Sequence, residues 1–145
     1  MPRKVLFVCL GNICRSPAAE GVFRQLAPGI GADSAGTAGW HVNKPPYCPM
    51  QAAARARGYD LSDLRARRIR TGDFARFDLI IAMDAQNLAE IEALRPADSD
   101  TPVQLFTDYA PGTGMDHVPD PYYTRDFDGA LDLIEIAARG LLAAL

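Results

Sequence analysis

The stretch Lys4-Val-Leu-Phe-Val-Cys9 places five apolar residues in a row directly before a turn-prone segment, Leu10-Gly-Asn-Ile-Cys14. A run that does not alternate with polar residues is typical of a strand buried on both faces, as in a parallel sheet. After the turn, Ser16 suits the N-cap of a helix and Pro17 its first helical position. Pro28-Gly29 then ends the apolar helical pattern. The stretch therefore predicts a buried strand, a tight loop and a helix.

Short apolar runs and amphipathic segments continue to alternate up to the C-terminus. We expect strands at residues 4–9, 32–38, 78–83 and 103–106, and further helices at about 50–57, between 84 and 96, and at about 127–145. Residues 107–126 are rich in Gly and Pro and are expected to form a long irregular loop of the kind that carries function. This rhythm predicts one α/β domain over residues 1–145: a three-layer sandwich with a short parallel sheet of about four strands and helices on both faces. Ligands bind such sheets beyond the C-terminal strand ends.

Composition and charge narrow the class of protein. Of the 145 residues, 48% are hydrophobic and 23% charged, which is ordinary for a globular chain. The longest apolar run, Val5 to Leu10, is far too short to span a bilayer. Residues 1–72 carry 11 Lys/Arg against 4 Asp/Glu and residues 73–145 carry 4 against 14, which together with a pI near 5.3 argues against nucleic acid binding. Three cysteines do not suggest a disulfide framework and predict a reducing cytoplasm.

The loop from Cys9 to Arg15 has the size and position of an anion site. Because it leads into a helix, successive backbone N–H groups can curl inward beside the positive end of the helix dipole and form a phosphate-binding loop. Arg15 adds a planar fork for two phosphate oxygens, and Gly11 and Asn12 accept positive φ at low cost. The same surroundings favour a thiolate at Cys9. A nucleophile and an oxyanion cradle are thus expected to coincide.

Two motifs give the chain a specific resemblance to a known family. Cys9-x5-Arg15-Ser16 resembles the signature of the low-molecular-weight protein tyrosine phosphatases, and Asp120-Pro-Tyr-Tyr123 resembles that family's second motif, at the expected distance near the C-terminus. Asp33-Ser-Ala-Gly-Thr37, Trp40 and the stretch from Asp73 to Asp84 also look like family segments. The resemblance therefore covers nearly the whole chain and suits a bacterial-type member.

The resemblance implies hydrolysis of protein phosphotyrosine and small aryl phosphates through a phosphocysteine. Cys9 is then the nucleophile, Arg15 and the backbone amides from Leu10 to Arg15 hold the phosphate, and Asp120 is first the acid and then the base. Residues implied in substrate binding are Leu10, Gly11, Asn12, Ile13, Cys14, Ser16, Trp40, Tyr122 and Tyr123. Ser16 is also implied as a donor to the Cys9 thiolate, and Asn12 and Ser34 as supports of the loop. No cofactor or metal is implied. The expected partners are phosphotyrosine proteins and phosphate-like oxyanions, with no nucleic acid or membrane, bound by a monomer or weak dimer.

Several residues leave a choice open. Trp40 is interpreted as a wall of the substrate cleft, with a core aromatic under a loop as the alternative. Cys14 shares the loop with Cys9 and could form a reversible disulfide with it. Tyr47-Cys-Pro-Met50 stands where many relatives have an Asp and an Arg, and Leu64 where a relative often has a His that supports the loop asparagine.

Competing interpretations remain to be weighed. Arg65, Arg67, Arg68 and Arg70 are most simply a solvated face, with a docking patch for an acidic or phosphorylated partner as the alternative. An arsenate reductase on the same fold must relay a disulfide through later cysteines, and none follows Cys48, which we expect to be unpaired and unreactive. A Cys9–His117 protease leaves the arginine of the loop without a purpose. An inactive phosphate-binding module is opposed by the intact nucleophile, arginine and acid.

Overall fold

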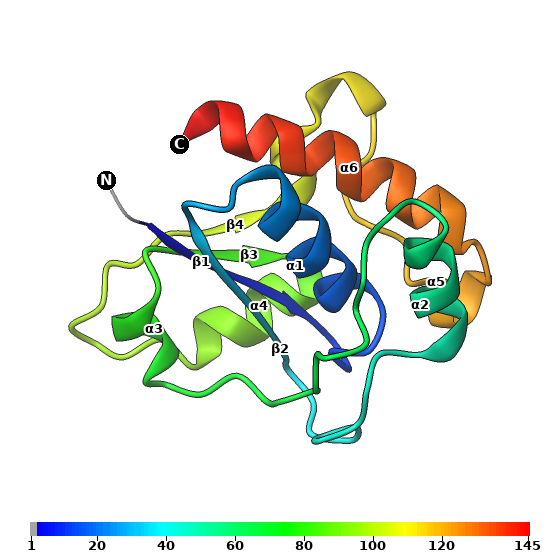
Figure 1. The fold of residues 1–145 in the computed structure, drawn as a ribbon. Coiled ribbons are helices and arrows are strands. Elements are labelled where there is room, and N and C mark those ends of the chain that lie inside the picture. The colour runs from blue at the N-terminus through cyan, green and yellow to red at the C-terminus, as the bar shows by residue number, and fades with distance from the viewer. Residues whose placement is uncertain (1–2) are drawn as a thin grey trace.

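The computed structural model describes residues 3–145 and contains one four-stranded sheet between two layers of helices (Figure 1). The strands are β1 (Lys4–Cys9), β2 (Gly31–Gly36), β3 (Leu79–Ala82) and β4 (Val103–Leu105). The α-helices are α1 (Arg15–Leu26), α2 (Cys48–Arg55), α3 (Asp73–Arg76), α4 (Ala85–Ala93), α5 (Pro121–Thr124) and α6 (Phe127–Ala144). The strand order is β2-β1-β3-β4, with every neighbouring pair parallel. The predicted α/β architecture with a short parallel sheet is confirmed.

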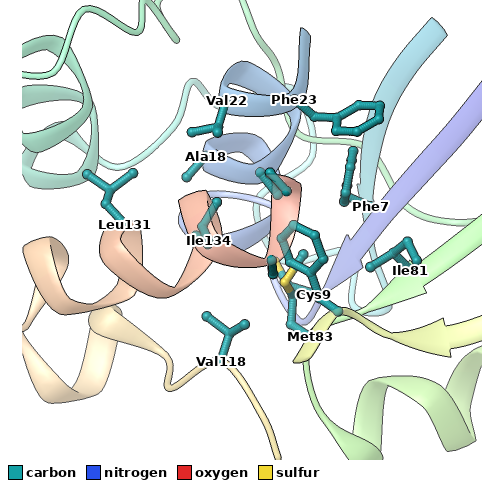
Figure 2. Close-up of a cluster of buried hydrophobic side chains, with 14 of the residues drawn as sticks. Phe7, Cys9, Ala18, Val22, Phe23, Ile81, Met83, Val118, Leu131 and Ile134 are labelled. Carbon is teal, nitrogen blue, oxygen red and sulfur yellow. The ribbon is translucent and has the colours of Figure 1, made fainter. Parts of the chain in front are cut away.

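The central strand β1 is buried on both faces, which explains its unbroken apolar run. Positions 5, 7 and 9 belong to the larger core with α1, α2 and α6, where the ring centroid of Phe7 lies 5.6 Å from that of Phe23 and 5.3 Å from that of Phe106. Positions 6 and 8 belong to a smaller core with residues of α3 and α4. Figure 2 shows the larger core, with Cys9 among its side chains. Strand β1 therefore runs through the middle of the molecule, and its last residue, Cys9, lies at the C-terminal edge of the sheet.

Most element boundaries differ from the predicted ones by a few residues. Strand β2 ends at Gly36 rather than at residue 38, and α2 begins at Cys48 rather than at residue 50. The segment 107–126, predicted as irregular, contains α5, most of the short 3-10 helix η1 (Phe106–Tyr109) and all of a second one, η2 (Pro111–Thr113). Across residues 3–145, no helix is long and apolar enough to cross a bilayer.

The prediction that Ser16 caps the first helix is wrong. Helix α1 already begins at Arg15, and the residue at its N-cap is Cys14, whose side chain accepts no capping hydrogen bond. Ser16 lies inside the first turn, with its Oγ 3.0 Å from the sulfur of Cys9. Its hydroxyl is therefore engaged by the loop and not by the helix terminus. Pro17, predicted at the first helical position, is instead the third residue of α1, where its missing N–H still has no helical partner to lose.

The loop after β1 packs tightly against the end of β2. The N–H groups of Thr37 and Ala38 donate to the carbonyls of Cys9 and Leu10, each at 2.9 Å. A Cβ atom on Gly36 would lie 2.7 Å from the Leu10 carbonyl oxygen. Glycine therefore permits an approach between two backbones that any side chain would prevent, and the loop is fixed at the C-terminal edge of the sheet.

Candidate active site

A pocket opens at this edge of the sheet, where three distant segments of the chain meet. It is lined by Cys9, Leu10, Gly11, Ile13, Cys14, Trp40, His41, Asp120, Tyr122 and Tyr123. Cys9 and Cys14 are buried, whereas Trp40 is 66% exposed and Tyr123 69% exposed. Trp40 thus lies at the rim of the pocket, which rules out the core-aromatic alternative. His41 was not predicted, because a lone histidine in a loop carries no sequence signal.

Two polar groups lie within hydrogen-bond distance of the sulfur of Cys9. The hydroxyl of Ser16 lies 3.0 Å from Sγ, and the backbone N–H of Asn12 donates to Sγ at 3.3 Å. Asn12 has a φ of 58°, the left-handed conformation that Asn tolerates better than most residues. Positive φ was predicted for both Asn12 and Gly11, but among these two only Asn12 adopts it. Two hydrogen bonds of this kind stabilise negative charge on the sulfur.

Arg15 is buried, and its shortest contacts within the protein are made by Nη1. Nη1 donates to Asp84 at 2.8 Å and to the Val118 carbonyl at 3.0 Å. Nη2 lies 3.5 Å from Asp120, and Nε is buried without a hydrogen-bond partner. Burial opposes the charge, but Cys9 and the two carboxylates outweigh it and raise the pKa of Arg15. The Nε–Nη2 edge is therefore charged and can still donate hydrogen bonds to a ligand.

Asp120 caps the short helix α5 and faces Arg15. Its Oδ1 accepts the backbone N–H of Tyr122 at 3.1 Å, while Oδ2 lies 3.5 Å from Arg15 Nη2. One carboxylate oxygen therefore fixes the residue and the other faces Arg15, while Asp120 lines the pocket together with Cys9. The sequence suggested a turn residue at this position, and the structure shows both a capping residue and a pocket residue.

Asn12, a residue of the loop, and Ser34, on β2, do not line the pocket but are joined to each other by side-chain hydrogen bonding. The Asn12 Nδ2 donates to Ser16 Oγ at 2.8 Å and to Ser34 Oγ at 3.0 Å. Its Oδ1 accepts the backbone N–H of Arg67 at 3.0 Å. Leu64, the position where a relative often has a supporting His, instead packs against the larger core. In this chain a backbone amide therefore holds the asparagine oxygen.

The interpretation of the arginine-rich stretch as a solvated face is wrong for Arg67. Its guanidinium is half-buried between Asp33, at 3.1 Å, and the fully buried Asp73, at 3.0 Å. Burial opposes the charge of Arg67, but the two carboxylates prevail and raise its pKa. Arg65 and Arg70 are exposed, as expected. The two ion pairs of Arg67 fix the position of this residue, whose backbone N–H donates to Asn12 Oδ1.

The remaining cysteines and the second histidine have different settings. Cys14 is buried, and its burial together with the charges of Asp120 and Cys9 raises the pKa of its thiol to about 12. Cys48 is exposed and unpaired. His117 bonds to Asp116 and does not line the pocket with Cys9. Within residues 3–145, no three His, Cys, Asp or Glu side chains are grouped so that they could hold a metal ion.

An aromatic cluster connects the segment before α2 to α5, the helix that Asp120 caps. The ring of Tyr47 lies 5.1 Å from that of Tyr122, and the Arg125 guanidinium donates to the Tyr47 hydroxyl at 3.0 Å. Arg125 also lies over the Phe127 ring at 5.2 Å. Tyr47, one of the residues that depart from the family pattern, therefore supports one wall of the pocket.

The comparisons with known proteins agree with this geometry. Residues 4–145 match the model of the low molecular weight phosphotyrosine protein phosphatase family. The low molecular weight protein-tyrosine-phosphatase YfkJ of Bacillus subtilis is 41% identical over 147 aligned residues, covering 97% of this chain and 94% of the relative. Its crystal structure superposes with a TM-score of 0.93 at 40% identity, covering 99% of this chain and 94% of that one. A structure described as a Drosophila arginine phosphatase has a TM-score of 0.91 at 32% identity, with 97% and 96% covered.

These matches extend over the whole pocket and both of its motifs. The chain therefore belongs to the low molecular weight phosphotyrosine protein phosphatase family, and it is an enzyme of the phosphoric monoester hydrolase class.

Proposed function

We propose that the protein hydrolyses protein phosphotyrosine and small aryl phosphates through a phosphocysteine on Cys9. The observation that carries this proposal is the convergence on one sulfur of the Ser16 hydroxyl and the Asn12 N–H, in a pocket that also holds Asp120. A sulfur anion supported in this way is a nucleophile placed where a phosphate can enter. Residues 1–145 act as a single catalytic domain in this proposal.

In the first step the Cys9 thiolate attacks phosphorus and the bond from phosphorus to the phenolic oxygen breaks. Asp120, in its protonated form, gives its proton to the departing oxygen. The negative charge on the transferring phosphoryl oxygens is met by the loop amides and by the Nε–Nη2 edge of Arg15, on which Nε has no protein partner and Nη2 has only the 3.5 Å ion pair with Asp120. The products are a free phenol and phosphocysteine.

In the second step a water molecule attacks the phosphocysteine and Asp120 takes a proton from it. The bond between sulfur and phosphorus breaks, and Cys9 leaves as a thiolate. The Ser16 hydroxyl, 3.0 Å from the sulfur, stabilises that leaving group. Inorganic phosphate and the starting enzyme result.

The shape of the pocket favours an aromatic leaving group. Ile13 and Cys14 give it apolar depth, while Trp40, Tyr122 and Tyr123 form the rim. A phenyl ring can lie between these side chains with its phosphate at Cys9, whereas phosphoserine is too short to fill the space. Because one structural relative is described as a Drosophila arginine phosphatase, phosphoarginine is a second substrate to compare. The apolar and aromatic walls suit a phenyl ring better than the polar guanidinium of phosphoarginine.

A cytoplasmic setting is proposed with this function. Cys9, Cys14 and Cys48 are all free thiols in the structure, and the cytosol is the compartment that keeps thiols reduced. The substrates are then phosphotyrosine proteins of that compartment, with inorganic phosphate and similar oxyanions as competing ligands of the loop.

The test is a turnover panel on the purified protein with Cys9→Ser as control. We expect hydrolysis of an aryl phosphate and a phosphotyrosine peptide, weak or no release from phosphoserine and phosphoarginine peptides, and no thiol-dependent reduction of arsenate. Rapid quenching should trap phosphate on Cys9. Because a serine hydroxyl is not ionised near neutral pH, Cys9→Ser should bind phosphate without turnover. Parental rates in Cys9→Ser, or phosphate binding without turnover in the parent, would reject the proposal.

A further inference from the structure

A buried carboxylate outside the pocket ends a hydrogen-bond chain that starts at the nucleophile. Glu20 is on α1, one turn after Ser16, and is only 3% exposed. Its Oε1 accepts the hydroxyl of Ser34 at 2.7 Å, and its other oxygen pairs with Arg24 on the next turn. Burying a carboxylate carries a free-energy cost, and neither catalytic step proposed above employs it. Its position therefore needs an explanation.

The donors and acceptors around Asn12 have only one assignment. Because the backbone N–H of Arg67 can only donate, the amide oxygen of Asn12 must face it, at 3.0 Å. Both Nδ2 protons then point to hydroxyl oxygens, to Ser16 at 2.8 Å and to Ser34 at 3.0 Å. Each hydroxyl therefore receives a hydrogen bond from Asn12 and must place its own proton elsewhere.

The two remaining protons have defined acceptors. Ser34 donates to Glu20 at 2.7 Å. Ser16 has two acceptors within reach, the Cys9 sulfur at 3.0 Å and the Ala35 carbonyl at a marginal 3.4 Å. The donations therefore diverge from the Asn12 amide, through Ser16 to the sulfur of Cys9 and through Ser34 to the buried carboxylate of Glu20.

We propose that Glu20 is a positioning residue for the phosphatase reaction: by accepting the Ser34 proton it holds Asn12 so that Ser16 donates to the Cys9 sulfur. This inference rests on the proposed function. The hydrogen bond to sulfur matters before the attack and again when sulfur leaves, because in both states the sulfur is negative. Glu20 takes the Ser34 proton on the side away from Asn12, so the Ser34 oxygen stays available to accept the Asn12 amide.

The fold alone does not require a carboxylate at this place. Burial raises the pKa of Glu20, against the opposing effects of the Ser34 hydrogen bond and the Arg24 charge. An apolar side chain of the same length would avoid this desolvation, and Arg24 is exposed enough to reach water without its partner. Stability and catalysis can therefore be separated at this position.

The test is Glu20→Met, which keeps the length of the side chain and a high helix propensity but accepts no hydrogen bond. We expect kcat for an aryl phosphate to fall by about tenfold, the cost of weakening one hydrogen bond to a charged group, with KM changed by less than about twofold. The pH midpoint for alkylation of Cys9 by iodoacetamide, followed by peptide mass, should move upward. Glu20→Gln keeps an acceptor oxygen and should restore both values. Gln25→Ala, exposed on the same helix, is the matched control and should equal the parent.

A purely structural role predicts a different result. A folded Glu20→Met protein with parental kcat and parental alkylation midpoint would overturn the inference. If Glu20→Met does not fold, Ser34→Ala breaks the same network by removing one oxygen: a lower kcat together with a higher alkylation midpoint supports the inference, and parental values overturn it. An inactive parent would reject the proposed function instead, while the Cys9 alkylation midpoint would still test the link to Glu20.

Discussion

The guanidinium of Arg15 is held by one end so that its other edge can serve a ligand. Nη1 is occupied by Asp84 and the Val118 carbonyl, while Nε has no partner. Lysine at this position keeps a charge but has a single nitrogen, which cannot satisfy these acceptors and also grip two phosphate oxygens. We expect Arg15→Lys to lower kcat by about 10² to 10³, the usual loss for one preorganised oxyanion donor. Steady-state kinetics measure this; Arg65→Lys, on the exposed surface, is the control. A parental rate in Arg15→Lys would contradict the proposal that the Arg15 guanidinium holds two phosphate oxygens.

Asp120 can be tested by the leaving group. If its carboxyl protonates the departing oxygen, Asp120→Asn should cost about 10² to 10⁴ in rate. The loss should grow with the pKa of the leaving phenol, because a poor leaving group needs the proton more. A residue that only caps α5 through the Tyr122 N–H predicts a uniform loss. A series of substituted phenyl phosphates distinguishes the two, and parallel plots for parent and variant would exclude the acid role.

Cys14 lines the same pocket as Cys9, and we expect it to close a disulfide with Cys9 after oxidation. Peroxide oxidises the Cys9 thiolate to a sulfenic acid; the Cys14 sulfur then attacks it and water leaves. Since the pKa of Cys14 is raised to about 12, closure should accelerate as pH rises. Peptide mapping should find the Cys9–Cys14 crosslink, and Cys14→Ser should recover less activity with dithiothreitol. Equal recovery of both proteins would refute the prediction.

The end of β2 is a fixed support for the catalytic loop. A methyl group at Gly36 meets the Leu10 carbonyl oxygen at 2.7 Å, so one backbone must move. We expect Gly36→Ala to lower the free energy of unfolding by about 1 to 3 kcal/mol, and to lower kcat because the loop shifts. Gly29→Ala is the matched control, since no atom lies within 4 Å of its added Cβ. Urea unfolding and aryl phosphate turnover measure the two effects, and a parental rate for Gly36→Ala would show that the loop tolerates the shift.

Elements built on apolar patterns were predictable, and those built on polar contacts were not. The run from Lys4 to Cys9 predicts β1 because both of its faces are buried. The N-cap assigned to Ser16 was wrong because a serine hydroxyl can bond either to a helix N–H or to a nearby sulfur, and the sequence does not distinguish the two. Only the fold brings the Cys9 Sγ to 3.0 Å from the Ser16 Oγ. Arg67 appeared as a surface charge because its partner Asp33 is distant in sequence. The roles of the pocket residues came from motif resemblance and remain proposals.

A polar contact joins the segment that follows α2 to α6. Tyr59, just after α2, donates to Glu135 at 2.5 Å, and Arg57 pairs with the same carboxylate at 2.6 Å and with Asp132 at 2.9 Å. These bonds join segments more than 70 residues apart. Helix α6 also packs on α1, the helix that carries Arg15 and Ser16. Loosening this contact should therefore lower the free energy of unfolding more than it lowers the rate of catalysis.

The pH dependence of stability tests this contact. Burial and the hydrogen bond and charge of Glu135 raise the pKa of Tyr59 from 10.0 to about 12. A group with a raised folded-state pKa stabilises the fold fully below its unfolded value, and the stabilisation is lost as pH rises through the folded value. We expect Tyr59→Phe to cost about 1 to 2 kcal/mol near neutral pH, and the gap between parent and variant to narrow between pH 10 and 12. Urea midpoints against pH measure this, with Tyr123→Phe at the exposed rim as control. A gap that stays constant up to pH 12 would mean that the phenol contributes only packing.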